Sequence, residues 1–184
     1  MNKNKINTFT TILLACLLPL TGATQVLDFS FEFQAYPTGL IPGLRIEKPF
    51  HEKNAVHLRL GYNWIRHGSL GVQDDERGDG FGFSLGYKRY LKSSFRSWYL
   101  GLKNDIWFNE LDWETEVQNA TMRGTSKIIV VQPTLEAGHL FLLKNNWIFT
   151  PSIAFGFEIN VKTEGAEMGQ GAILLLGFHF GRRF

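Results

Sequence analysis

Cysteine is almost absent from this chain of 184 residues, in which Cys16 is the only example. A single thiol excludes an internal disulfide and a zinc site built from several thiolates. A long hydrophobic run is missing too, because the apolar stretch at residues 12–20 is about half of the roughly 20 residues that a transmembrane helix needs. Charge is nearly balanced, with 19 Lys and Arg against 17 Asp and Glu. The composition therefore gives no indication of nucleic-acid binding.

The first residues are typical of a secretory signal peptide. Lys3 and Lys5 precede the apolar stretch, and the small residues Thr21, Gly22 and Ala23 follow it. Basic residues, a short apolar core and small residues are the three parts of a cleavable signal. We therefore predict a signal peptide over residues 1–23 and one mature domain over residues 24–184, which has balanced charge and no cysteine.

A lipoprotein signal is the alternative interpretation of the same segment, because residues 13–16 loosely resemble a lipobox that ends at Cys16. The residues after the cysteine remain apolar, whereas a lipoprotein has a polar tether there. Cleavage after Ala23 is the better interpretation.

Apolar and polar residues alternate along the whole predicted mature domain. In residues 26–36, one face carries Leu27, Phe29, Phe31, Phe33 and Ala35. The opposite face carries Asp28, Ser30, Glu32 and Gln34. A period of two indicates a β-strand with two different faces. The pattern predicts eight strands, at residues 26–36, 41–49, 55–66, 81–91, 98–108, 128–141, 147–160 and 170–184.

The connections between these strands alternate in length. Residues 51–54, 92–97 and 143–146 form short connections, whereas residues 67–80, 109–125 and 161–169 form long, hydrophilic ones. Only the first connection of the second kind, at residues 37–39, is brief. Transmembrane barrels have short periplasmic turns and longer extracellular loops. We therefore predict an even number of strands, with both termini in the periplasm.

The distribution of apolar residues distinguishes a membrane barrel from a soluble barrel such as a lipocalin. An eight-stranded barrel has room inside only for packed side chains or one small ligand. The apolar face is continuous in nearly every strand, and the chain contains 16 Phe. We therefore predict an all-β fold, an eight-stranded antiparallel transmembrane up-and-down β-barrel with the apolar face outward.

The predicted inner face carries charges of both signs. Its charged residues are Glu32, Arg45, Glu47, Arg59, Lys88, Lys103, Asp105, Glu136 and Glu158. An unpaired buried charge is costly, so we predict a network of ion pairs across the lumen. Glycines on the same face leave space for these long side chains.

Aromatic residues near the predicted strand ends indicate the belts that mark the two surfaces of a membrane. We assign Phe50, Trp64, Trp98 and Trp147 to these belts. Trp107 has the inward parity, which argues against a belt position for it.

The last predicted strand carries the most specific signal. Leu174, Leu176, Phe178, Phe180, Arg182 and Phe184 share one face of it. This arrangement resembles the closing strand of bacterial outer-membrane barrels, whose terminal aromatic and alternating apolar residues form an assembly signal. The resemblance assigns that role to Leu176, Phe178, Phe180 and Phe184. Residues 26–184 as a whole are similar to the small OmpA- and OmpX-type barrels, which implies location in the bacterial outer membrane.

That family includes structural, adhesive, channel-forming and enzymatic members, so the fold alone does not select a function. We expect a non-enzymatic barrel with a charge-paired polar lumen, which serves envelope structure or surface interaction through its extracellular loops. A narrow pore or small-molecule conduit is the first alternative. A lipid A-modifying enzyme is the second.

The best catalytic candidate is the pair of His67 and Ser69, which would lie near the outer rim on one strand face. The Asn-rich context that follows the His-x-Ser motif of lipid A enzymes is missing, and Gly68 and Gly71 favour the start of a loop. We therefore assign no catalytic residue.

The segment at residues 73–80 holds two further motifs, an acidic cluster and the adhesion tripeptide Arg77-Gly78-Asp79. The acidic residues lack the ligand order of a calcium loop. We interpret the segment as a solvated, flexible loop, with no metal and no cofactor. The partners expected for such a protein are outer-membrane lipid, lipopolysaccharide and the outer-membrane barrel assembly machinery. We expect a monomer.

Overall fold

The computed structural model describes residues 26–93, 95–117 and 120–184. The predicted signal peptide, its cleavage site and the alternative lipobox all lie outside these residues. Within the described residues, no helix has the length and apolar character needed to cross a membrane.

Nearly all of the described chain is β-structure. The long strands are β1 (Asp28–Tyr36), β2 (Gly39–Phe50), β3 (Asn54–Arg66), β4 (Asp75–Tyr90), β5 (Trp98–Val117), β6 (Ala120–His139), β8 (Trp147–Glu164) and β9 (Gly171–Arg183). Three short elements complete the order: the 3₁₀ turns η1 (Gly68–Leu70) and η2 (Lys144–Asn146), and the two-residue strand β7 (Phe141–Leu142).

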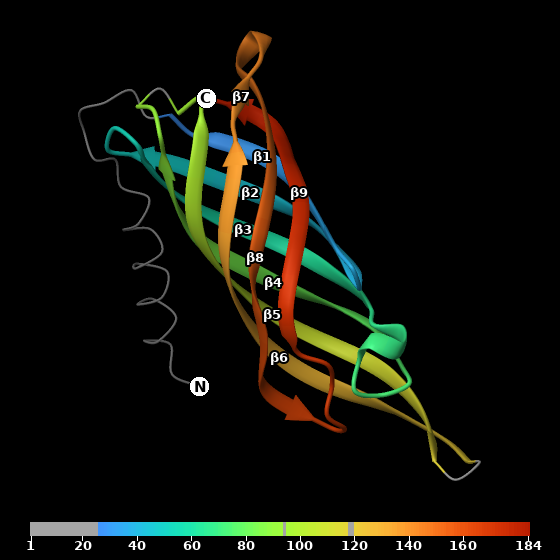
Figure 1. Cartoon of the computed structure of the whole chain (residues 1–184). Coiled ribbons are helices and arrows are strands. Elements are labelled where there is room, and N and C mark those ends of the chain that lie inside the picture. The colour runs from blue at the N-terminus through green and yellow to red at the C-terminus, as the bar shows by residue number, and fades with distance from the viewer. Residues whose placement is uncertain (1–25, 94, 118–119) are drawn as a thin grey trace, which may run out of the picture.

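The eight long strands form a closed antiparallel ring. Each of β1 to β5 pairs with the next strand, β6 pairs with β8, and β8 pairs with β9. The ring closes where β1 pairs with β9, from Asp28 opposite Arg183 to Ala35 opposite Leu176. Figure 1 shows the resulting barrel, with the beginning of β1 and the end of β9 at the same end. The predicted eight-stranded up-and-down barrel is confirmed.

We name the two ends of the barrel after these features. The terminal end contains Asp28 and Arg183, and the hairpin end contains the tips of the β3–β4, β5–β6 and β8–β9 connections. At the terminal end, Arg183 donates two hydrogen bonds of 2.7 Å to the Asp28 carboxylate and so ties the first strand to the last. Both chain ends of the barrel therefore meet at one rim, as an even strand count requires.

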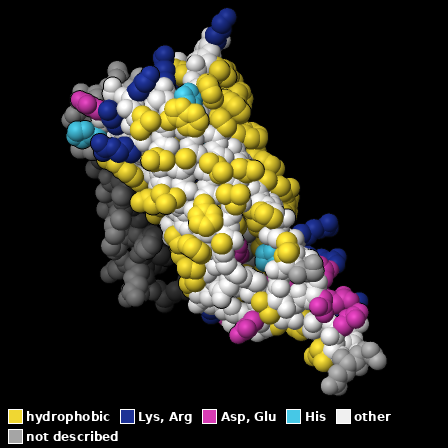
Figure 2. All heavy atoms as spheres, viewed as in Figure 1, with side chains coloured by type: hydrophobic (Ala, Val, Ile, Leu, Met, Phe, Trp, Pro, Cys, Tyr) yellow, Lys and Arg dark blue, Asp and Glu magenta, His cyan; other side chains and the backbone are white. Residues whose placement is uncertain are grey.

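The outer surface is apolar along the barrel wall. Lipid-facing positions such as Leu60, Phe81 and Leu102 are more than half exposed, at 62%, 67% and 62%. Figure 2 shows apolar side chains over the wall and charged side chains gathered towards the two ends. Exposed apolar area of this extent is unstable in water and is matched by the hydrocarbon of a bilayer.

The side chains predicted to form the assembly signal and the aromatic belts all point outward. Leu176, Phe178, Phe180 and Phe184 are exposed on the last strand and the residue after it. Phe50, Trp98 and Trp147 lie at strand ends of the terminal end, and Trp64 lies near the hairpin end of β3. The belt positions therefore bracket the apolar wall on both sides.

The prediction of long hydrophilic loops was wrong in part. β5 and β6 continue as a ribbon to Val117 and Ala120, and β4 begins at Asp75. Arg77-Gly78-Asp79 therefore lies within β4, paired with β3 and β5, and not in a flexible loop. In residues 110–117 charged and apolar residues still alternate, but the charged ones face outward and Leu111 is buried inside, which reverses the pattern of a lipid-facing strand.

The strand pairing is irregular near Pro133. Pairing between β6 and β8 passes from Val131–Ile159 directly to Thr134–Gly156, and the register shifts between Ile129 and Val130. Proline has no backbone N–H to donate to a neighbouring strand, which accounts for the interruption beside it.

Candidate functional site

The half of the lumen next to the terminal end holds a buried network of charges. Arg45 and Arg59 lie at its centre, and both are 0% exposed. Glu32 bridges them, with one carboxylate oxygen 2.8 Å from Arg45 Nη1 and the other 3.0 Å from Arg59 Nη1. Arg45 Nη2 also lies 3.2 Å from Glu47 Oε2. β1, β2 and β3 are thus joined through the interior as well as through their backbones.

The other charges of the network also lie beside opposite charges. Asp105 lies 3.0 Å from Arg59 Nη2 and 3.1 Å from Lys103 Nζ. Lys88 Nζ lies 3.0 Å from Glu47 Oε2. Glu136 lies 3.9 Å from Arg45 Nη1 and accepts a 2.6 Å hydrogen bond from the Tyr99 hydroxyl. Four cations and four carboxylates therefore neutralise one another, as their burial requires.

Uncharged side chains complete this network. Gln34 Oε1 accepts hydrogen bonds from Arg59 at 2.6 Å and from Lys103 at 2.9 Å. Ser84 accepts one from Arg59 Nε at 2.9 Å, and the Tyr90 hydroxyl donates one to Glu47 at 2.5 Å. The sequence placed Gln34 on the polar face of its strand, but neither it nor Ser84 and Tyr90 was assigned to the network, although their inward parity was a usable signal.

Glu158, which was predicted to join the network, lies elsewhere. It lies on β8 towards the hairpin end and is partly exposed. Within the part of the chain that the structure describes, no cation lies within ion-pair distance of it. With Tyr36, His67 and Ile173 it lines a cavity of about 430 Å³ between the β1–β2 turn and the start of β9.

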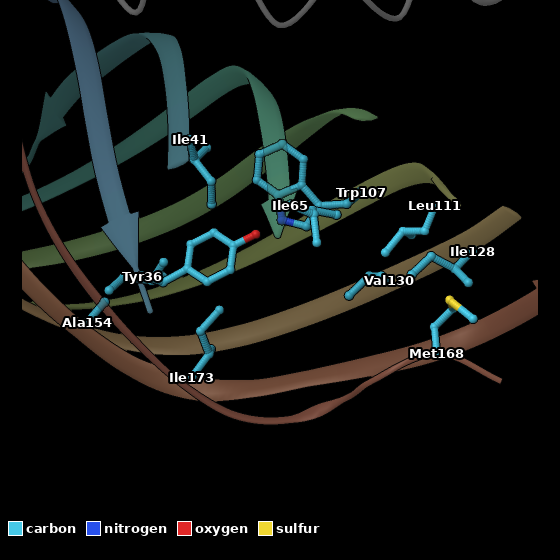
Figure 3. Close-up of a cluster of buried hydrophobic side chains, with 11 residues drawn as sticks. Tyr36, Ile41, Ile65, Trp107, Leu111, Ile128, Val130, Ala154, Met168 and Ile173 are labelled. Carbon is cyan, nitrogen blue, oxygen red and sulfur yellow. The ribbon is translucent and has the colours of Figure 1, made fainter. Parts of the chain in front are cut away.

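The other half of the lumen contains a large apolar cluster, which the sequence did not predict, beside a few buried polar side chains such as Asn63 and Asn109. Figure 3 shows the cluster, and its buried members come from seven strands and from the β8–β9 connection. They are Tyr36, Ile41, Ile65, Trp107, Leu111, Ile128, Val130, Ala154, Met168, Ile173 and Leu175. We call this set the apolar cluster. The prediction of a polar inner face therefore describes only half of the lumen.

Trp107 joins the two halves of the lumen. Its indole Nε1 donates a 2.9 Å hydrogen bond to Gln132 Oε1, and the Arg59 guanidinium lies 5.3 Å from its ring centroid. Gly82 provides the space for it, because a Cβ at that position would approach the indole to 2.4 Å. At least one of the inward glycines is thus needed for a bulky neighbour.

The β8–β9 connection folds over the hairpin end of the lumen and is fixed there by Glu76. The Glu76 carboxylate lies 2.7 Å from His67 Nδ1 and accepts backbone hydrogen bonds from Val72 at 2.7 Å, Gln73 at 3.0 Å and Gly169 at 3.2 Å. Burial opposes the charged form, but these donors hold the pKa of Glu76 below its ordinary value. Met168 is thereby pressed onto the apolar cluster. We call residues 165–170 the cap.

The arrangement around His67 bears on the catalytic alternative. Its Nδ1 forms a hydrogen bond with Glu76. The same carboxylate also accepts backbone hydrogen bonds from the β3–β4 and β8–β9 connections. The side chain of Ser69 lies outside the described part of the structure, so no relation between the two groups is established. Among the described residues, no group of three or more His, Cys, Asp or Glu is arranged to hold a metal ion.

Comparison with known proteins gives similarity of fold alone. No family model matches the sequence, and no curated protein matches it at a significant level. The structure is similar to the N-terminal β-barrel domain of Pseudomonas aeruginosa OprF, with 14% identity over 86% of this chain and 97% of that chain and a TM-score of 0.43. It is also similar to Neisserial surface protein A, with 10% identity over 87% and 96% and a TM-score of 0.48.

A third similar structure is the outer membrane protein AlkL in lipid bilayers, with 15% identity over 91% of this chain and 95% of that chain and a TM-score of 0.46. All three are small barrels of comparable length. The fold of this chain is established by its own ring of paired strands.

Proposed function

We propose that this chain is an integral β-barrel of the bacterial outer membrane that catalyses no reaction and keeps its lumen closed. Its role would be to support the envelope or to present its outer hairpins for surface interaction. The observation that carries this proposal is the burial of Arg45 and Arg59, each bonded to two carboxylates across the lumen.

Ion conduction would require water to separate these pairs. The charged network closes the terminal half, and the cap with the apolar cluster closes the hairpin half. Two barriers of different chemistry therefore lie in series along the lumen, and this favours a closed barrel over an open pore.

Conductance measurement tests the closed lumen. The purified protein, refolded in a planar lipid bilayer, should give no stepwise currents, and Arg59→Ala should give more leakage than the parent. Regular current steps from the parent protein would overturn the proposal.

The absence of catalysis needs a separate experiment, because a closed lumen is compatible with an enzyme at the rim. Mass spectrometry should give the same lipid A acyl pattern for three kinds of cells. These are cells with the protein, cells without it, and cells with the double variant His67→Ala and Ser69→Ala. A missing or added acyl chain that depends on Ser69 would promote the lipid A-modifying alternative.

A small-molecule conduit is the second candidate, and the cavity beside the β1–β2 turn favours it. This cavity of about 430 Å³ joins the inward residues Tyr36 and Ile173 to the outward residues Phe155 and Leu174. A small apolar solute could therefore enter from the side without crossing the charged network. Uptake of such solutes into protein-containing vesicles, absent from protein-free vesicles, would support this candidate.

The partners that we propose are outer-membrane lipid, lipopolysaccharide and the barrel assembly machinery. The exposed aromatic Phe184 follows β9, and its backbone exchanges hydrogen bonds of 2.8 and 3.0 Å with Leu27. Phe184→Asp should lower the fraction of heat-modifiable, membrane-inserted protein in cells. An unchanged folded fraction would exclude the assembly role.

A further inference from the structure

Among the described residues of the lipid-facing wall, a single amide side chain lies in the middle of the apolar band. Asn104 points outward on β5, midway between the boundary residues Trp98 and Glu110. A strand rises about 3.3 Å per residue and tilts by about 40°, which puts Asn104 roughly 15 Å from each boundary. The other outward polar residues of this part of the wall, Lys48 and Arg89, lie next to strand ends, where long side chains reach the headgroups.

The Asn104 amide lacks a partner in its own barrel. It is exposed, and within residues 26–93, 95–117 and 120–184 it takes part in no side-chain hydrogen bond. Hydrocarbon offers neither a donor nor an acceptor, so an amide at this depth is costly unless another molecule supplies both.

Asn104 borders a groove across the barrel wall. One edge is the row Leu85, Asn104, Pro133 and Phe157, and the other is the row Val56, Tyr87, Leu102, Leu135 and Phe155. The backbone of the inward residues between these rows forms the floor, and the volume is about 760 Å³. The groove exists because Asn104 and Pro133 are small beside the leucine and phenylalanine side chains around them.

The interrupted ladder lies on the same edge of this groove. Pairing between β6 and β8 is missing at Pro133, the direct neighbour of Asn104 on β6. Two departures from an ordinary lipid-facing wall, an unpaired amide and a break in the backbone ladder, therefore coincide.

We propose that this groove is the contact surface for a second copy of the same chain within the membrane. A carboxamide carries both a donor and an acceptor, so it is complementary to itself. In a two-fold dimer the same surface meets on both copies, and each Asn104 donates to and accepts from the other. A plain acyl chain would fill the groove but leave the amide unpaired. A monomer was expected from the sequence, because the sequence alone does not show that Asn104 lies in the middle of the membrane.

The experiment compares self-association of four full-length proteins by sedimentation equilibrium in density-matched micelles. Wild type should dimerise reversibly. Asn104→Leu should weaken the dimer about tenfold, which corresponds to about 1.4 kcal/mol. Leu102→Trp, which fills the groove, should abolish the dimer. The matched control Leu44→Trp, an equally lipid-facing leucine on β2, should leave it intact. Heat-modifiable mobility in gels verifies that every variant is folded.

Three outcomes would overturn the proposal. They are a wild type that stays monomeric at every concentration, an Asn104→Leu variant that dimerises as well as wild type, and equal loss of the dimer in Leu44→Trp. Native mass spectrometry distinguishes a lipid occupant. A monomeric wild type that retains a lipid lost from Asn104→Leu would assign the groove to a hydroxylated acyl chain instead.

Discussion

The two halves of the lumen are filled by different chemistry within one continuous wall. The terminal half contains Arg45, Arg59 and their carboxylates, whereas the hairpin half contains the apolar cluster beneath the cap. In the first, stability depends on complete pairing, because one missing partner leaves a charge in a dry interior. In the second half stability depends on packing, and the loss of stability increases with the volume of side chain that a substitution removes. The same barrel should therefore respond very differently to substitutions at its two ends.

The largest effect is expected from Arg59→Ala. This change leaves Glu32 and Asp105 each with one cation fewer and should lower the free energy of unfolding by about 3 to 5 kcal/mol, the cost of breaking a buried pair. Urea unfolding of the protein from lipid vesicles measures it. An unchanged midpoint would mean that water already screens the network, and the contrast between the halves would disappear.

Gly82→Ala tests the boundary between the halves. The new methyl group would approach the Ile106 carbonyl oxygen to 2.2 Å and the Trp107 indole to 2.4 Å, so both the neighbouring strand and the ring would have to move. We expect a loss of about 1 to 3 kcal/mol, as for other overpacked interiors. A shift of tryptophan fluorescence should accompany the loss. Unchanged emission and unchanged unfolding would show that the interior around Trp107 is loose.

Glu76→Gln tests how the cap is held. Loss of the carboxylate weakens the bonds to His67 and to the Gly169 amide, so hydrogen exchange in residues 165–170 should become about tenfold faster at neutral pH.

The pH dependence of the cap follows from the lowered pKa of Glu76. A carboxyl whose pKa is lowered in the folded state stabilises that state fully at a pH above its ordinary pKa of 4.5. This stabilisation is lost as the pH falls through the lowered pKa. After correction for intrinsic exchange, the cap of the wild type should loosen on acidification, whereas the Gln variant should not. Parallel curves for both proteins would contradict a role for Glu76.

Arg123→Ala should have the smallest effect. Arg123 forms a 3.0 Å pair with Glu114 on the exposed ribbon of β5 and β6, where water screens both groups. The expected change in unfolding free energy is below about 1 kcal/mol, and it serves as the surface control for Arg59→Ala. A loss as large as that for Arg59 would mean that the ribbon contributes to barrel stability.

The predictable part of this fold is the part that contacts lipid. Alternation identified the outward residues of β3 and the inward position of Arg59, because a strand in a membrane has two unlike surroundings. The same rule failed on the ribbon at Asp112 and Glu114, because there the charged residues face outward and the apolar Leu111 faces inward, the reverse of the lipid-facing pattern. Parity also could not reveal that Glu158 and Glu32 lie at different heights, because height depends on the stagger of the strands. The apolar cluster was missed for the same reason.

The seam between β1 and β9 has a consequence for the order of folding. Asp28 and Arg183 are separated by 155 positions in the sequence, yet they form an ion pair at the end of the ladder that joins the first strand to the last. Contacts of such long range form slowly, because the whole intervening chain must be ordered first. The seam should therefore be among the last parts to form. Substitution of Asp28 should therefore accelerate unfolding far more than it slows folding, and the lifetime of the folded barrel would be set in part at this seam.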